Sequence, residues 1–293
     1  MAYKPYDDAF ALVMPKLGLI LFNRKTIYEM HKNTLELFAF VKDEVEIIEF
    51  FIKHHIEIFD EITIVDNGST DGTLEVIGRY PVKLVINHCP FSMKGEVCTD
   101  LMLKSECDLL VPMDADEKVV FDNGTVIKKD PILIREYLQS VEITGCKYMI
   151  RKIYNHHPDN DGWYDSSFRH TKIIFPRETF MYTDPGFHRG RTKLDEESSF
   201  EQQFYWRCFE KQILTDKVSS IDVSYFHYHY ASKERWLKNT EKKLKARLGD
   251  KWNDIDFLKS YTGPSVHCKR EYLNYVEQGI WCNLEKNTYI EEG

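Results

Sequence analysis

The stretch Glu61-Ile-Thr-Ile-Val-Asp66-Asn-Gly-Ser-Thr-Asp71-Gly-Thr73 joins an apolar run of strand length to an acidic turn that contains two glycines. A second stretch, Cys107-Asp-Leu-Leu-Val-Pro-Met-Asp114-Ala-Asp116-Glu117, has the same plan. In an open parallel sheet, side chains at the carboxyl ends of the strands line the ligand crevice. The two stretches therefore predict carboxylates from two strand ends facing one binding site.

The spacing of the second acidic turn indicates what that site would hold. Asp114 and Asp116 are separated by one residue, and two such carboxylates can share a hard cation such as Mg²⁺ or Mn²⁺, which in turn binds phosphate oxygens. We expect Asp66 and this pair to meet over one nucleotide diphosphate. That arrangement favours group transfer from an activated nucleotide donor.

The elements around these turns alternate along the chain. Asp43 offers an N-cap to a helix whose apolar residues recur every three or four positions up to Phe59. His54 and His55 fall on this helix and are expected to be structural. Further helices are predicted from about Leu74 and over 93–104, between strands at 35–41, 61–65, 82–86 and 109–113. Such alternation predicts right-handed βαβ units, and hence an α/β fold with a parallel sheet.

The second half of the chain is less regular. It contains runs of alternating or continuous apolar residues that are typical of strands, and two helical stretches, one aromatic and one basic. The expected strands are 146–154, 172–175 and 221–230, and the expected helices are 198–212 and 233–248. No linker divides the chain into independent domains.

Composition excludes several classes of protein. The chain has 293 residues, 43% of them apolar, which is enough for a folded core. Its net charge of −8 argues against a general nucleic-acid binder. Seven cysteines without a C-x-x-C pair indicate free thiols in a reducing compartment. The N-terminus lacks the basic-then-apolar plan of a signal peptide, and no apolar run reaches the ~20 residues that span a bilayer. We therefore expect a cytoplasmic protein without a transmembrane segment.

Three stretches together resemble a known family. They are Phe38 through Thr73, the "D-x-D"-like stretch from Cys107 to Glu117, and His227-Tyr-His-Tyr-Ala-Ser-Lys-Glu-Arg-Trp-Leu-Lys238. The last is similar to a late "H-Y-x-x-x-S-x-E-x-(aromatic)-x-x-K" signature. In order and spacing the set resembles the GT-A glycosyltransferases, family 2-like branch. The Q-x-x-R-W motif of processive members and a Glu-Asp pair after a Gly/Trp-rich turn are both missing.

The resemblance implies a fold and a domain plan. The fold would be GT-A (Rossmann-like), with a mostly parallel central sheet flanked by helices and a less regular acceptor-side C-terminal half. The glycosyltransferase domain would span 1–250, with its nucleotide-binding half at 35–120 and its acceptor-side half at 121–232. Residues 233–293 would form a helical extension packed on the same domain. The basic face of 233–248 would be solvated, with peripheral contact to anionic lipid as the alternative.

The resemblance also implies an activity. A single sugar would move from a nucleotide-sugar donor, UDP-linked, to a carbohydrate or glycoconjugate acceptor, with inversion and with Mn²⁺ or Mg²⁺ as cofactor. Asp116 is expected to bind the ion and His227 to complete the metal shell, while Asp114 would bind the ribose, or the ion through water. Asp66 would bind the uracil or ribose and the backbone at Val41 would flank the base, while the diphosphate would meet Lys42 and Lys94.

Acceptor-side roles fall on later residues. The base that deprotonates the acceptor hydroxyl is expected in the cluster Asp195-Glu196-Glu197, with Asp184, Asp161 and Asp165 as rivals. Trp163 is the best platform for stacking on a sugar. Together with Trp163, the expected acceptor contacts are Asp165 and His188.

Two other functions stay open. A sugar-phosphate nucleotidyltransferase also joins a nucleotide, a divalent ion and a sugar phosphate, but it would carry a Gly-rich phosphate loop after its first strand, where this chain has Val41-Lys-Asp-Glu44. A catalytically silent carbohydrate-binding relative would bind glycans and transfer nothing. A phosphatase with a strand-end D-x-D is disfavoured because Lys118 stands where such enzymes usually have Thr or Val.

Overall fold

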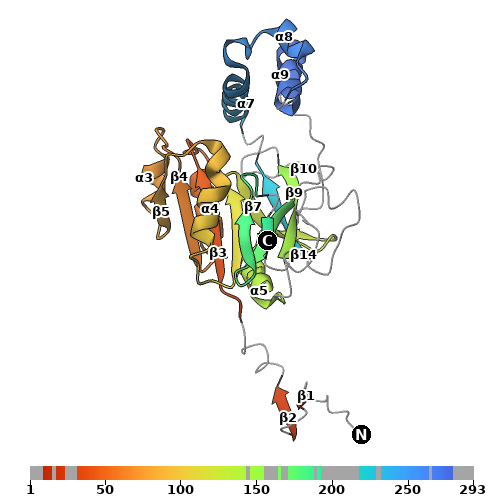
Figure 1. Ribbon diagram of the computed structural model, residues 1–293. Coiled ribbons are helices and arrows are strands. Elements are labelled where there is room, and N and C mark those ends of the chain that lie inside the picture. The colour runs from red at the N-terminus through yellow and green to blue at the C-terminus, as the bar shows by residue number, and fades with distance from the viewer. Residues whose placement is uncertain are drawn as a thin grey trace, which may run out of the picture.

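The structure is a computed structural model that describes residues 9–14, 18–23, 32–142, 146–154, 164–165, 171–187, 190–192, 218–228, 232–263 and 266–279. Its centre is one large sheet, which Figure 1 shows with helices packed along it. The strand order in this sheet is β5-β4-β3-β6-β11-β9-β14-β7-β8, with β10 pairing to β9. The predicted α/β fold with a central sheet flanked by helices is confirmed.

Four parallel strands form the first half of the sheet: β3 (Leu35–Val41), β4 (Glu61–Asp66), β5 (Lys83–Ile86) and β6 (Leu109–Asp114). Every residue of β3 is buried, as is typical of a parallel strand that is covered on both faces. Its neighbours β4 and β6 are nearly as apolar, so the main core gathers around these three strands and α2. The predicted strand positions agree with these bounds to within one residue.

Helices connect the parallel strands: α2 (Ile48–His55), α3 (Thr73–Ile77), the short η1 (Phe91–Met93) and α4 (Lys94–Met102). The prediction that Asp43 caps the first helix is wrong. Helix α2 begins five residues later, after Ile47, which makes no side-chain capping bond. The Asp43 carboxylate instead accepts the backbone N–H of Thr70 at 2.9 Å. The turn after β3 is thereby tied to the turn after β4.

The two histidines of α2 are structural, as expected. His54 Nε2 lies 2.7 Å from the carbonyl oxygen of Val119, and His55 Nε2 accepts the Val119 N–H at 3.3 Å. The other nitrogen of His55, Nδ1, lies 2.8 Å from the carbonyl oxygen of Phe51. Both rings are buried. They contact the backbone of Val119 in β7 (Glu117–Asp122), as a neighbouring strand would, and so join α2 to the sheet.

The second half of the sheet mixes directions. Strand β14 (Val218–His227) runs parallel to β9 (Cys146–Tyr154) and antiparallel to β7. It begins and ends three residues earlier than predicted, since its ladder to β7 ends at His227. The remaining elements are β8 (Ile127–Lys128), α5 (Pro131–Ser140), β10 (Tyr164–Asp165), β11 (Thr171–Pro176), β12 (Phe180–Thr183) and β13 (Gly190–Thr192). The helix predicted over 198–212 lies outside the described residues.

Near the N-terminus, β1 (Ala9–Met14) and β2 (Gly18–Asn23) pair only with each other, as an antiparallel hairpin. The division of the chain at residues 120, 232 and 250 stays a prediction.

Helices follow the sheet at the C-terminal side: α7 (Lys233–Leu248), η3 (Gly249–Lys251), α8 (Ile255–Ser260) and α9 (Val266–Gln278). Figure 1 shows them beyond one end of the sheet. Ser232 caps α7 by accepting the N–H of Arg235 at 3.1 Å. A small core of their own holds them together, made of Leu244, Leu258, Cys268 and Tyr272. Within the described part of the chain, none of the helices combines the length and the apolar character needed to cross a membrane.

Candidate active site

The carboxyl edge of the parallel strands brings together the predicted carboxylates. In the strand register, Val41 of β3 lies opposite Asp66 of β4, and Phe40 lies opposite Asp114 of β6. Adjacent strands are about 4.8 Å apart, so Asp66 and Asp114 flank the end of β3 about 10 Å from each other. This separation suits the two ends of one nucleotide diphosphate.

Asp66 is fully buried, and only one of its carboxylate oxygens is used. Its Oδ2 accepts the backbone N–H groups of Gly68 at 2.8 Å and Ser69 at 3.0 Å. Its Oδ1 has no hydrogen-bond partner among the described residues. A buried acceptor without a donor costs roughly 1–3 kcal/mol. An N–H or O–H group of a bound ligand would remove that cost.

The turn after β4 is shaped to keep Asp66 in place. Gly68 has a φ of +78°, and a Cβ at this position would lie 2.6 Å from Nδ1 of His88. Glycine is therefore required both for the backbone conformation and for the close approach of the segment after β5. Asn67 adds a second link, because its side-chain oxygen accepts the N–H of Cys89 at 3.0 Å.

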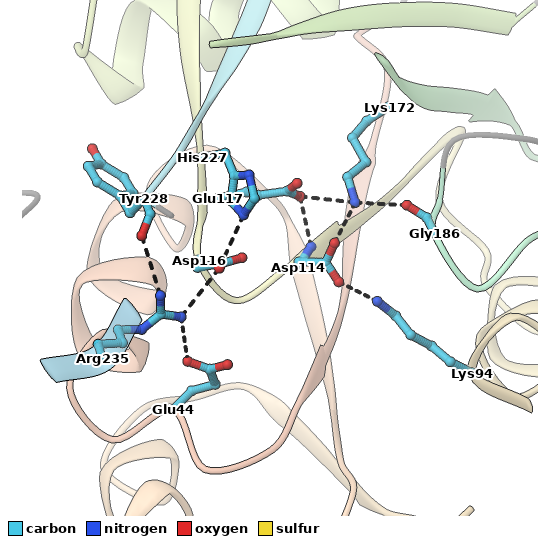
Figure 2. A network of polar contacts seen from close by, with 10 residues as sticks. All are labelled: Glu44, Lys94, Asp114, Asp116, Glu117, Lys172, Gly186, His227, Tyr228 and Arg235. Carbon is cyan, nitrogen blue, oxygen red and sulfur yellow. Dashed lines mark hydrogen bonds and ion pairs between the residues drawn. The ribbon is translucent and has the colours of Figure 1, made fainter. Parts of the chain in front are cut away.

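Asp114, at the end of β6, lies between two buried lysines (Figure 2). Its Oδ2 accepts from Nζ of Lys172 at 2.7 Å, and its Oδ1 is in direct contact with Nζ of Lys94. Lys172 also donates to the carbonyl oxygen of Gly186 at 3.0 Å. Burial alone would raise the pKa of Asp114, but Lys172 and Lys94 outweigh it and hold that pKa well below its ordinary value.

Glu117 completes this buried group of charges. Its Oε2 accepts the backbone N–H of Asp114 at 2.9 Å and lies 3.2 Å from Nζ of Lys172. Burial raises the pKa of Glu117 to about 8, against the opposing effect of Lys172. The pKa of Lys172 is raised, since Asp114 and Glu117 outweigh the lowering effect of burial.

The ring of Phe187 lies beside both lysines. Its centroid is 4.0 Å from Nζ of Lys94 and 5.0 Å from Nζ of Lys172, which are cation–π distances. The segment that carries Phe187 packs on the start of α4, where a Cβ on Gly95 would lie 2.6 Å from the carbonyl oxygen of Thr183. Asp184, one of the predicted base candidates, lies on the same segment, so it is close to the start of α4.

Asp116 lies in a second group of charges, in the turn between β6 and β7. Its Oδ2 lies 3.2 Å from Nε2 of His227 and 3.3 Å from Nη2 of Arg235. The same Nη2 donates to Oε2 of Glu44 at 2.7 Å, and Nη1 donates to the carbonyl oxygen of Tyr228 at 3.3 Å. Figure 2 shows Arg235 approaching from α7, with Glu44 and Asp116 on either side of its guanidinium group.

These contacts set the charge states of the two carboxylates. Burial alone would raise the pKa of Asp116, but His227 and Arg235 outweigh it and hold that pKa well below its ordinary value. Burial raises the pKa of Glu44 to about 7, against the opposing effect of Arg235. Near neutral pH, Asp116 is therefore the better cation ligand of the two.

The donor set suits a divalent cation that has two protein ligands. Asp116 offers a carboxylate whose Oδ2 is contacted by Arg235, and His227 offers an imidazole nitrogen, whereas each of the two oxygens of Asp114 contacts a lysine. In the ranges that the structure describes, there is no group of three or more His, Cys, Asp or Glu side chains able to hold a metal. Mn²⁺ accepts both kinds of donor, and the remaining positions would fall to diphosphate oxygens and water.

The other predicted site residues are placed as follows. Val41 is buried at the end of β3, where its carbonyl oxygen accepts the N–H of Asn67 at 2.9 Å, and Lys42 after it is exposed. Asp165 lies on β10, opposite Ile153 of β9. Outside the described residues lie Trp163, His188, Asp195, Glu196 and Glu197.

Sequence reasoning missed Glu44, Glu117, Lys172 and Arg235. For Arg235 a signal was available. Trp236, Thr240 and Leu244 recur every four residues along α7, and all three are buried. Arg235 is next to Trp236 and so borders the buried face of the helix, although the many basic residues of α7 suggested that its charged side chains face solvent. Arg235 is only 5% exposed.

Comparison with known proteins gives a family match. Residues 40–123, from the end of β3 to the end of β7, match the sequence model described as "Glycosyl transferase family 2". No match was found among the curated proteins.

The solved structures similar to this chain are distant. Glucosyl-3-phosphoglycerate synthase from Mycobacterium tuberculosis, in complex with Mn²⁺, UDP and glucosyl-3-phosphoglycerate, is 19% identical with a TM-score of 0.31; the match covers 41% of this chain and 44% of that one. The chain thus spans less than half the length of that synthase. Residues 1–349 of S. aureus TarS are 12% identical with a TM-score of 0.40, over 84% of this chain and 72% of that one.

The family match and the candidate site fall on the same part of the chain. The family match covers β6 and both turn carboxylates Asp114 and Asp116, together with Asp66. The strands within it form the parallel half of the sheet. Residues 40–123 of this α/β fold therefore match glycosyl transferase family 2, and the match includes the strand ends that carry the candidate site.

Proposed function

We propose that the protein is a metal-dependent glycosyltransferase that moves one sugar from a UDP-linked donor to a carbohydrate or glycoconjugate acceptor, with inversion at the anomeric carbon. The family match over 40–123 supports the reaction class. The observation that carries the proposal is the convergence of Asp66, Asp116 and His227, from three distant parts of the chain, at one edge of the sheet.

On the donor side, the free oxygen of Asp66 accepts a hydrogen bond from the uracil or the ribose. Its burial and its lack of a protein donor support this role. The backbone at Val41 lines the same strand edge, and exposed Lys42 follows it toward the diphosphate. Asp114 orients the ribose, while Lys94 and Lys172 hold Asp114 and contribute positive charge near the diphosphate.

Asp116 and His227 would hold Mn²⁺ or Mg²⁺. When bound, the ion supplies neutralisation of the negative charge that develops on the leaving diphosphate. The chain's contribution is to keep one carboxylate ionised in a largely buried site, as the lowered pKa of Asp116 supports.

On the acceptor side, a carboxylate takes the proton of the acceptor hydroxyl as the hydroxyl oxygen attacks the anomeric carbon. The bond from that carbon to the diphosphate oxygen breaks, and the nucleotide leaves as UDP. We assign the base to the cluster Asp195, Glu196 and Glu197, with Asp184 as the alternative. We assign the acceptor contacts to Trp163, Asp165 and His188.

A screen of nucleotide sugars by thermal unfolding tests the donor assignment. UDP-linked sugars should raise the unfolding temperature in the presence of Mn²⁺, and chelation with EDTA should remove the shift, because a ligand that binds only the folded state stabilises it. GDP- and CDP-linked sugars serve as controls. An equal shift with every nucleotide, or no loss with EDTA, would contradict a metal-dependent UDP site. The cytoplasmic location and the lipid contact of α7 stay predictions from the sequence.

A further inference from the structure

Arg235 lies outside the family-matched segment 40–123, but its guanidinium group makes hydrogen bonds beside Asp116. It lies in the first turn of α7, where Ser232 caps the helix. Its guanidinium group donates to Glu44, Asp116 and the carbonyl oxygen of Tyr228. At 5% exposure it is buried, so it is positioned to act on Asp116 and not on the donor directly.

The carboxylates around Asp116 are paired with buried cations. The two connected groups hold four carboxylates, Glu44, Asp114, Asp116 and Glu117, and three cations, Lys94, Lys172 and Arg235. Hard divalent cations bind tightly where several carboxylates are available to them. Among the described residues of these two groups, Glu44, Asp114 and Glu117 are each paired with a cation, so Asp116 and His227 remain as possible ligands, and Arg235 adds a positive charge beside Asp116.

We propose that Arg235 is a positioning residue that keeps the divalent-ion affinity of the donor-free site low, so that the ion and the donor diphosphate bind cooperatively. The inference rests on the proposed function. A diphosphate brings the negative charge that the protein's own residues lack, so each ligand improves the site for the other. By linkage, the ion must raise the affinity for UDP by the same factor as UDP raises the affinity for the ion.

Arg235 also connects the proposed metal site to the proposed nucleotide site. Glu44 lies in the turn after β3, whose strand end flanks the proposed base site, and Arg235 joins this turn to Asp116. Lys242 makes a second contact from α7 to the same turn, 3.6 Å from Asp43. Lys242 is half exposed and has no contact to Asp116, which makes it a matched control for the loss of one α7 charge.

Calorimetry with Mn²⁺ alone and with Mn²⁺ plus UDP, on the full chain, tests the inference. Wild type should bind Mn²⁺ weakly alone and at least tenfold more tightly with UDP. Arg235→Met should bind Mn²⁺ alone roughly tenfold more tightly than wild type, since even at the dielectric constant of water the repulsion between a unit charge and a divalent ion ~5 Å apart corresponds to about that factor. Arg235→Lys should restore the weak binding, and Lys242→Gln should match wild type.

Glu44→Gln separates electrostatics from loss of packing. At pH 8, above the pKa of about 7 to which burial raises Glu44, removing its negative charge should weaken Mn²⁺ binding, the opposite direction to Arg235→Met. If the two variants instead shift Mn²⁺ affinity in the same direction, Arg235 acts through structure alone and the inference is wrong. Equal Mn²⁺ affinity of wild type with and without UDP would also overturn it. Failure of wild type to bind UDP under any condition would instead refute the proposed function.

Discussion

Asp116 and His227 are 111 residues apart in the chain, yet the Oδ2 of one lies 3.2 Å from Nε2 of the other. Asp116 follows β6, and His227 ends β14, which pairs with the strand that follows Asp116. The register places His227 opposite Glu117, so the sheet itself brings the imidazole to the carboxylate. The two proposed metal ligands, held in this way by the sheet, have little freedom to move apart.

Asp116→Ala should abolish the Mn²⁺ dependence of UDP binding. The substitution removes the carboxylate from the proposed ligand pair of Asp116 and His227. Calorimetric titration of UDP with Mn²⁺ and with EDTA measures the effect. Asp100→Asn, which removes an exposed carboxylate from α4, is the control and should leave the metal dependence intact. Metal-dependent UDP binding that survives in Asp116→Ala would place the ion elsewhere.

Asp66→Asn should weaken UDP binding by roughly 1–3 kcal/mol, the cost of losing one hydrogen bond to a charged acceptor. The remaining side-chain oxygen can still accept from Gly68 and Ser69, so the unfolding temperature should change little. Asp71→Asn is the matched control, because Asp71 accepts from Thr73 and Val45 in the neighbouring turn. It should lower stability and leave UDP affinity unchanged. Unaltered UDP affinity in Asp66→Asn would reduce Asp66 to a turn residue.

Among Asp195→Asn, Glu196→Gln and Glu197→Gln, one should lower turnover by ~10²–10⁴-fold with UDP affinity nearly intact, which is the signature of a lost general base. Steady-state kinetics with saturating donor distinguish this from a helix-start carboxylate, whose loss affects mainly stability. Near-normal turnover in all three variants would move the assignment to Asp184, tested by Asp184→Asn.

Acid should destabilise the fold through His55. Burial lowers the pKa of His55 to about 3, so the unfolded chain binds a proton at a higher pH than the folded one does. The stabilisation is complete above pH ~6.5 and falls by ~1.4 kcal/mol per pH unit below it. The stability difference between wild type and His55→Phe should therefore shift by about 2 kcal/mol against wild type from pH 7 to 5.

Denaturant unfolding at a series of pH values measures that shift. Ile52→Val, a buried change on the same helix that adds no titrating group, provides the comparison. Its difference from wild type should not depend on pH. A pH-independent difference for His55→Phe as well would mean that the ring titrates alike in both states.

The sequence predicted the parallel half of the fold well because each strand there is a continuous apolar run bounded by a turn. It failed at the start of α2, where Asp43 has a φ of +56° and bonds across to Thr70. It also missed α5, although Asp130 caps it and Pro131 opens it. An aspartate followed by a proline is a helix-start signal that can be recognised in the sequence.

The site could be predicted only in part. Asp66, Asp114 and Asp116 could be predicted because they follow apolar strands. His227 could be predicted because it begins the signature-like stretch over 227–238. Lys172 and Arg235 were not, since a charge pair such as Arg235 with Glu44 joins residues 191 positions apart. Nothing in the spacing of a sequence shows such a contact before the sheet order is known.

Phosphorus NMR of a UDP-sugar incubated with the protein, Mn²⁺ and a panel of glycan acceptors tests the central claim most directly. We predict that free UDP appears with at least one donor, that its release depends on Mn²⁺, and that Asp116→Ala abolishes it. Binding of the UDP-sugar without release of UDP from any donor and acceptor pair would contradict transfer and identify a silent relative. Formation of UTP from the UDP-sugar and added pyrophosphate would contradict it in favour of a nucleotidyltransferase.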